Sequence, residues 1–287
     1  MPTITINGSG FEYIEKGNGT PVVFVHGTIN DYRIWKNQIE RFAKQYRAIS
    51  YSRRYHYPNP WKGDGSDYSL SLHAQDLAAF IKALNLDRVH LIGSSYGAYT
   101  SLITAINNPD MIKTLVLGEP PVLPLLVINP DNPLQILSLF IRDFSTAKKF
   151  MKFGLKHLKP AQKALRNNQM EEAVELFASG ALGNDGYKNL PSEIKTTLMD
   201  NAPALKAELL GKNFPPFPKE EASRLNIPVL LVYGEKSPKL FHSISNLLLK
   251  ILPNSKKIII PNASHLIHEG NPVVYNEKVL EFLSKHI

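Results

Sequence analysis

The sequence predicts an α/β fold: a mostly parallel central sheet with helices on both faces, and an inserted helical cap. Short, continuous apolar runs recur along the chain, and such runs are typical of parallel strands covered on both faces. Helix-compatible segments separate these runs, which indicates strand–helix–strand units. The alternation stops near residue 120 and resumes near residue 225, with mostly helical, proline-punctuated sequence between those points.

The elements follow in order from the N-terminus. Residues 3–6 and 11–15 alternate polar and apolar side chains around a glycine-bearing turn, which predicts an antiparallel hairpin at the sheet edge. Further strands are predicted at 21–25, 46–51, 89–92, 112–117, 227–234 and 256–260. Helices are predicted at 32–43, 98–106, 237–252 and 272–285, and one more ends at residue 84 and is capped by Ser69 or Ser71.

The predicted organisation is a core interrupted by an insertion. Residues 1–120 and 225–287 are expected to form the α/β core, and residues 121–224 the helical cap over the carboxyl edge of the sheet. The apolar run 122–128 fits either an acyl or aryl pocket or the internal packing of the cap, and residues 215–218 fit an exit linker.

One segment of the predicted cap is strongly basic. Residues 146–166 contain no acidic side chain but carry Lys148, Lys149, Lys152, Lys156, Lys159, Lys163 and Arg166. A solvated helix face explains such a run, and attraction to anionic membranes or substrates is the alternative. Because Pro160 is expected to break the helix, we expect no stable membrane insertion.

Composition excludes several function classes. The formal net charge is +8, yet no nucleic-acid-binding motif is present, so no nucleic-acid partner is expected. The chain has no cysteine, which excludes a thiolate nucleophile and a zinc–cysteine site, and neither a metal nor a cofactor is expected. The start of the chain lacks the pattern of a signal peptide and no apolar run is long enough to span a bilayer, so we expect a cytoplasmic protein of open oligomeric state.

The strongest local pattern is Gly93-Ser94-Ser95-Tyr96-Gly97, which lies between a predicted strand and a predicted helix. Strand, sharp turn and helix form the context of a nucleophile elbow, in which the serine hydroxyl projects from the top of the sheet. The N–H of Tyr96 would then lie at a helix start, where it can donate to an oxyanion. A purely structural turn is the alternative.

Four other residues follow the carboxyl ends of predicted strands: Thr28, Glu119, Glu235 and His265. Because ligands of parallel α/β sheets bind at this edge, we expect these residues to lie near Ser95. His26, which ends the strand before Thr28, is expected to be a buried histidine bonded to backbone and not a base.

These motifs resemble the α/β-hydrolase superfamily, and specifically its capped single-domain members. The resemblance rests on His26-Gly27, the elbow, Gly234-Glu235-Lys236-Ser237 and Ala263-Ser264-His265. It implies that Ser95 is the nucleophile and His265 the general base, with His268 as the rival base. It also implies that the backbone N–H groups of Thr28 and Tyr96 form the oxyanion hole.

The sequence departs from the family pattern at two places. The family's acid follows the strand ending at Gly234 in a Gly-x-x-Asp pattern, but Ser237 stands there and cannot carry negative charge. Some relatives place the acid after the strand that follows the nucleophile helix, which favours Glu119 over Glu235 or over a triad without an acid. The second departure is at residues 51–54, where only Arg53 matches the usual Asp-x-Arg-Gly. The aromatic, basic loop that follows fits either a pocket wall or a solvated surface loop.

The predicted function is a cofactor-free serine hydrolase, most simply a carboxylesterase acting on a small apolar or aromatic ester. Serine at the elbow argues against haloalkane dehalogenases and epoxide hydrolases, which need a carboxylate nucleophile. Lactone, thioester or carbon–carbon bond hydrolysis would use the same machinery. A receptor-like binding protein with a decayed triad and an acyltransferase are the alternatives.

Overall fold

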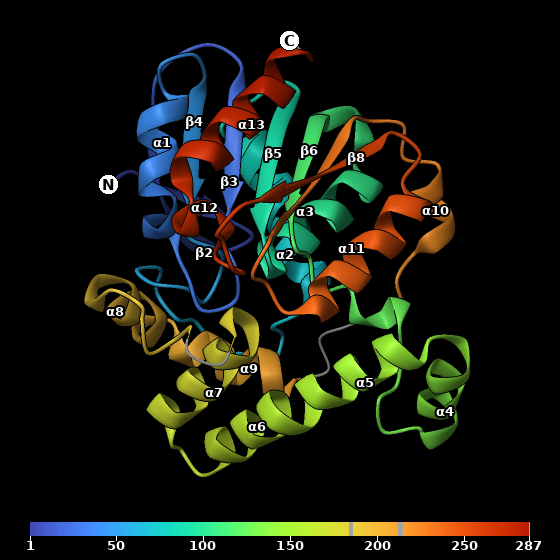
Figure 1. The fold of residues 1–287 in the computed structure, drawn as a ribbon. Helices are drawn as coiled ribbons and strands as arrows, with labels where there is room; N and C mark the ends of the chain where they lie inside the picture. Colours follow the sequence, from blue (N-terminus) through green and yellow to red (C-terminus); the bar gives the residue numbers. More distant parts are fainter. Residues whose placement is uncertain (184–185, 212–214, 287) are drawn as a thin grey trace.

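The computed structural model describes residues 1–183, 186–211 and 215–286, and these contain one eight-stranded sheet in the order β1-β2-β4-β3-β5-β6-β7-β8 (Figure 1). The first two strands pair antiparallel, and β2 pairs antiparallel with β4, whereas all later pairs are parallel. The predicted mostly parallel sheet is therefore confirmed. The strands are β1 (Thr3–Ile6), β2 (Ser9–Lys16), β3 (Pro21–Val25), β4 (Arg47–Tyr51), β5 (Val89–Ser94), β6 (Ile112–Gly118), β7 (Val229–Gly234) and β8 (Ser255–Ile260).

Helices cover both faces of the sheet because alternate strand residues point to opposite sides. In β3, Val22 and Phe24 belong to one apolar cluster, whereas Val23 and Val25 belong to another. The first cluster is completed by η1 (Tyr32–Trp35), α1 (Lys36–Phe42), α12 (Ile267–Gly270) and α13 (Pro272–Ser284). The second is completed by α2 (Leu70–Ala83), α3 (Tyr96–Asn107) and α11 (Lys239–Ile251). Ser69, not Ser71, caps α2 by accepting a hydrogen bond from the N–H of Leu72.

The described chain between β6 and β7 contains helices and no strand, and we call residues 121–224 the helical insertion. It lies beyond one end of the strands (Figure 1). Its helices are η3 (Leu123–Leu125), α4 (Pro133–Arg142), α5 (Phe144–Phe153), η4 (Gly154–Leu158), α6 (Lys159–Arg166), α7 (Met170–Leu182), α8 (Ser192–Asp200), α9 (Ala202–Leu210) and α10 (Lys219–Ser223). A short 3-10 turn, η2 (Pro109–Met111), precedes β6.

The expected break at Pro160 is wrong. Helices α5, η4 and α6 follow one another without a gap and form one long helix. Pro160 lies in the first turn of α6, directly after the π-helical turn η4, where its missing N–H costs least. The proline therefore leaves the basic segment helical throughout.

The loop after β4 is neither a solvated surface loop nor a wall of the catalytic pocket. Arg53, Arg54 and His56 are all buried. Arg54 forms an ion pair with Asp76 of α2, with distances of 2.6 and 2.8 Å from its nitrogens to the two carboxylate oxygens. The buried arginine side chains thus bind the loop to the end of β3 and to α2.

Within the described residues, no helix is long and apolar enough to cross a membrane.

Candidate active site

Ser95 occupies a sharp turn between β5 and α3. Its backbone has φ +53° and ψ −124°, a conformation that costs a non-glycine residue on the order of 1–3 kcal/mol. The turn is also crowded: a Cβ on Gly97 would come within 2.3 Å of the carbonyl oxygens of Val25 and His26, and one on Gly93 within 2.5 Å of Ala98. The glycines of the motif are therefore required by close backbone approach.

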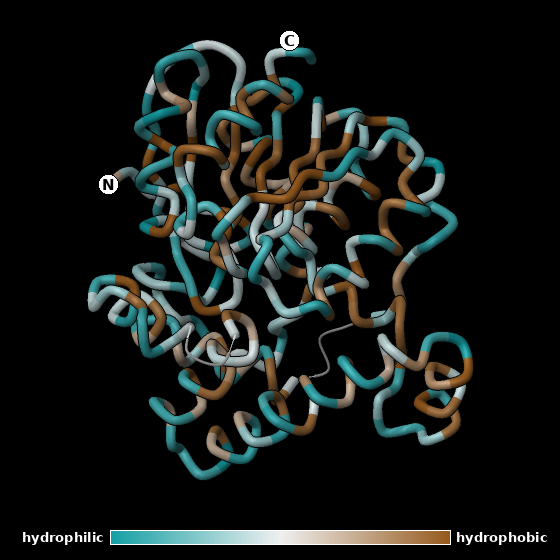
Figure 2. Tube along the Cα trace, viewed as in Figure 1, coloured by the Kyte–Doolittle hydropathy of each residue, from teal (hydrophilic) through white to brown (hydrophobic). Residues whose placement is uncertain are grey.

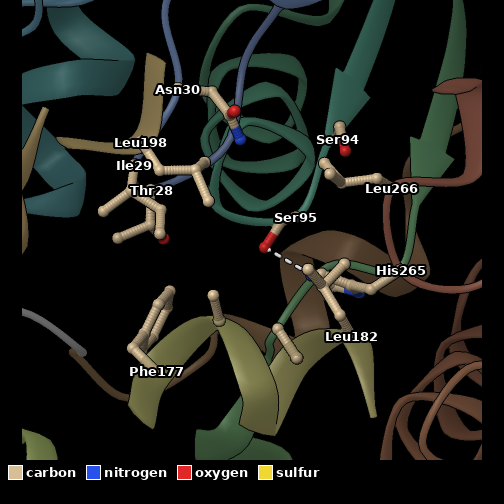
Figure 3. A pocket seen from close by; sticks show the side chains of 12 residues that line it. Thr28, Ile29, Asn30, Ser94, Ser95, Phe177, Leu182, Leu198, His265 and Leu266 are labelled. Carbon is tan, nitrogen blue, oxygen red and sulfur yellow. Dashed lines mark hydrogen bonds between the residues drawn. The ribbon is translucent and has the colours of Figure 1, made fainter. Parts of the chain in front are cut away.

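The side chains of Ser95, His265 and Glu119 form a continuous hydrogen-bonded chain. The Nε2 atom of His265 is 2.9 Å from the Ser95 hydroxyl oxygen, and its Nδ1 atom is 2.6 Å from Oε2 of Glu119. Figure 3 shows Ser95 pointing toward His265, with their hydrogen bond drawn as a dashed line. Glu119 is fully buried and His265 nearly so, which strengthens their interaction in a low-dielectric setting. This is the geometry in which a serine can lose its proton to an oriented imidazole.

Glu119 is held by the end of a neighbouring strand. Its Oε1 atom accepts a hydrogen bond of 3.0 Å from the N–H of Gly234, the last residue of β7. Its backbone φ is +47°, so a second strained residue stands in the site next to Ser95. Glu119 follows β6, but its carboxylate reaches the end of β7. In the family pattern, the catalytic acid itself follows the strand that corresponds to β7.

The rival residues lie elsewhere. Glu235 is exposed, and its Oε2 atom accepts a hydrogen bond from the N–H of Asn262. Ser237 is buried and its hydroxyl has no partner within the described residues. His268 is stacked on Trp35 with ring centroids 4.1 Å apart, and burial lowers its pKa to about 3. None of the three makes a hydrogen bond to Ser95 or His265 in the described chain.

Phe241 fixes the face of the His265 imidazole. The two rings are stacked with centroids 4.2 Å apart and an interplanar angle of 22°. Phe241 belongs to α11, and sequence analysis did not single it out because its position in an amphipathic helix is that of an ordinary core residue.

The loop that carries Thr28 is clamped through its carbonyls. Arg53 donates from Nε to the carbonyl oxygen of His26 and from Nη2 to that of Gly27, at 3.2 and 3.0 Å. His26 is buried and its Nε2 atom accepts from the N–H of Arg53, as expected for a histidine bonded to backbone. Because a trans peptide points its C=O and N–H in opposite directions, a Gly27 carbonyl held by Arg53 directs the N–H of Thr28 away from that side chain.

The insertion contributes a buried carboxyl that sequence analysis missed. Glu208 of α9 accepts hydrogen bonds of 3.0 Å from the hydroxyls of Thr28 and Tyr68. Burial raises the pKa of Glu208 to about 7, although Arg53, Tyr68 and Thr28 act in the opposite direction. In the sequence of α9, Glu208 follows Lys206 and resembles a solvated residue. Only the fold brings it against the loop that carries Thr28.

Replacement of Glu208 with glutamine is expected to change how stability depends on pH. Between about pH 4.5 and 7 the folded protein keeps a proton on Glu208 that the unfolded chain has released, so the free energy of unfolding falls as the pH rises. Glu208→Gln removes this dependence. Relative to the wild type, the variant should therefore gain on the order of 3 kcal/mol between pH 4.5 and 8 in urea unfolding.

Glu172→Gln, at an exposed position of α7, is the matched control and should show a constant difference from the wild type. A Glu208→Gln difference that is independent of pH would contradict the assignment.

A narrow, mostly apolar pocket surrounds Ser95. Its volume is about 30 Å³, and helices α7 and α8 of the insertion provide Phe177, Ala178, Ala181, Leu182 and Leu198. The core adds polar residues, among them Asn30, which is buried against the pocket and whose Oδ1 atom has no hydrogen-bond partner among the described residues. Such an oxygen is available to accept a hydrogen bond from a bound molecule. The run 122–128 does not line this pocket.

No group of three His, Asp or Glu side chains within the described residues is arranged to hold a metal ion.

The chain is similar to known proteins over most of its length. The family described as "alpha/beta hydrolase fold" matches residues 20–272. A protein of Bacillus subtilis (strain 168), provisionally named a 2-succinyl-6-hydroxy-2,4-cyclohexadiene-1-carboxylate synthase, is 27% identical and covers 99% of both chains. Epoxide hydrolase 3 of Xenopus tropicalis is 23% identical over 97% of this chain and 76% of its own. The crystal structure of the enol-lactonase from Burkholderia xenovorans LB400 superimposes with a TM-score of 0.76 at 16% identity, covering 99% of this chain and 100% of the other.

Proposed function

Because the chain belongs to the α/β-hydrolase fold family and is similar to several proteins named as hydrolases, we propose that it is a serine hydrolase that cleaves carboxylic esters. The observation that carries the proposal is the hydrogen-bonded chain from Ser95 through His265 to Glu119. The catalytic acid is Glu119, and Glu235 is the alternative.

The proposed reaction proceeds through an acyl-enzyme. His265 takes the proton of Ser95 as the hydroxyl oxygen attacks the ester carbonyl, and the resulting oxyanion is bound by the N–H groups of Thr28 and Tyr96. His265 then gives the proton to the leaving alcohol. Water attacks the acyl group in the second half, with His265 again accepting a proton, and Ser95 is regenerated. Glu119 holds the imidazole tautomer and stabilises its protonated form.

The nucleophile separates this chain from the epoxide hydrolase to which it is similar. Attack of a serine oxygen on an epoxide carbon would form an ether, which water does not cleave under mild conditions, whereas attack on a carbonyl forms an ester that it does. The apolar side chains of α7 and α8 favour a small acyl or aryl group next to the carbonyl.

The test is hydrolysis of p-nitrophenyl esters of increasing chain length, together with labelling by a fluorophosphonate, which reacts with activated serines. We expect turnover of at least one ester and a single labelled peptide that contains Ser95. Peptide mapping distinguishes Ser95 from Ser94, its neighbour, which makes no hydrogen bond to His265 in the described chain.

Two outcomes would overturn the proposal. Folded protein that neither turns over an ester nor reacts with the probe would favour a receptor-like binding protein. Product that appears only when an alcohol or amine acceptor is added would favour an acyltransferase.

A further inference from the structure

An apolar stripe is exposed at one corner of the helical insertion. Leu134, Leu137 and Ile141 of α4 and Phe144 at the start of α5 are 72%, 56%, 78% and 63% exposed. Leu134, Leu137 and Ile141 are spaced three and four residues apart and so lie on one face of α4. Phe144 begins α5, directly after the non-helical Asp143. Ile128 and Leu155 are also more than half exposed. Large side chains gathered in this way mark a surface that another molecule covers.

The stripe lies at the edge of the molecule. In Figure 1, α4 forms a corner far from the sheet and is followed by the long helix of α5, η4 and α6. Figure 2 shows hydrophobic positions along α4 at this outer corner. The stripe is therefore separate from the pocket around Ser95, which is lined by α7 and α8 of the insertion.

The adjoining long helix carries positive charge on its exposed side. Its exposed basic residues are Lys148, Lys152, Lys156, Lys159, Lys163 and Arg166. None of them forms an ion pair with a carboxylate of the described residues. Lys148 joins the two features, since its ammonium lies 5.6 Å from the centre of the Phe144 ring. Because Pro160 does not interrupt the helix, the basic residues lie along one continuous helix that begins next to the stripe.

We propose that this corner of the insertion docks on an anionic lipid surface. The apolar side chains of α4 enter the boundary between headgroups and acyl chains, and the lysines contact the anionic headgroups. Each lysine near such a surface strengthens the attraction, and burial of the apolar side chains adds to it. A bilayer surface is favoured over a second copy of the chain, because a second copy would bring the same uncompensated lysines together. The docking is peripheral and needs no membrane-spanning element.

The test is co-sedimentation with vesicles of phosphatidylcholine alone or mixed equally with phosphatidylglycerol. We expect at least tenfold tighter binding to the anionic vesicles and a marked loss in 0.5 M NaCl, where screening is strong. Leu137→Ser with Ile141→Ser should weaken binding more than tenfold. Val273→Ser, at an equally exposed apolar position of α13, is the matched control and should leave binding unchanged.

A second pair of variants tests whether binding depends on the lysines of the long helix or only on the net charge of the protein. Lys152→Glu with Lys156→Glu should weaken binding to anionic vesicles more than tenfold. Lys44→Glu with Lys82→Glu changes the net charge equally at exposed positions of the core and should have less than a threefold effect. The thermal unfolding midpoint of each variant checks that the fold is retained.

Three results would overturn the proposal. These are equal binding to neutral and anionic vesicles, equal loss in the two lysine pairs, and a dimer in light scattering that Leu137→Ser with Ile141→Ser converts to a monomer. The last result would assign the stripe to a second copy of the chain. None of these readouts requires ester hydrolysis, so the docking and the proposed function fail independently.

Discussion

Ser95→Ala should reduce kcat for ester hydrolysis by about 10⁴-fold or more, because no other oxygen in the described chain is hydrogen-bonded to Nε2 of His265. The alanine keeps the backbone position and leaves the oxyanion donors in place. Residual hydrolysis should therefore exceed that in buffer and should show no acyl-enzyme burst. Rapid-mixing kinetics with a p-nitrophenyl ester measures both quantities.

Ser237→Ala is the matched control for this variant. Ser237 is also a buried serine close to the carboxyl end of a strand, but its hydroxyl has no partner in the described residues. We expect kcat to change less than about twofold. If Ser95→Ala retained wild-type kcat, the nucleophile would lie elsewhere and the proposed acyl-enzyme would be wrong.

The sheet was predictable because its signals are local. Apolar runs such as 21–25 and 89–92 lie on strands that are buried on both faces, so their composition alone identifies them. The hairpin at the edge was equally readable from its alternation. The break expected at Pro160 was wrong because proline disrupts a helix in its interior but not in its first turn. The π-helical turn η4 ends at Leu158, so Pro160 lies in the first turn of α6.

Residues at the strand ends could be expected to meet, since topology brings the carboxyl ends of parallel strands to one edge. The sequence could not decide whether Glu119 or Glu235 bonds to His265. The answer depends on how far the Glu119 side chain extends past the end of the neighbouring strand. Contacts from the insertion were beyond prediction. Glu208 and Thr28 are 180 positions apart in the sequence, and the residue pattern of α9 does not predict their contact.

Glu119→Gln is the second large effect, and the contact with Gly234 makes its outcome specific. The N–H of Gly234 requires an acceptor, so the glutamine must turn its carbonyl oxygen toward Gly234. Its NH₂ group then faces Nδ1 of His265, which has to become an acceptor. The imidazole proton consequently moves to Nε2, where it prevents His265 from taking the proton of Ser95.

We therefore expect Glu119→Gln to lower kcat by on the order of 10⁴-fold, with KM changed much less, because both the tautomer and the stabilisation of the imidazolium are lost. Glu235→Gln is the matched control: its carboxylate is exposed and bonded to the backbone of Asn262, so kcat should stay within about twofold of the wild type. A large loss in Glu235→Gln with none in Glu119→Gln would transfer the acid to the loop after β7. Wild-type rates in both variants would mean that His265 acts without a carboxylate, and the buried bond to Glu119 would then serve only to hold the ring in place.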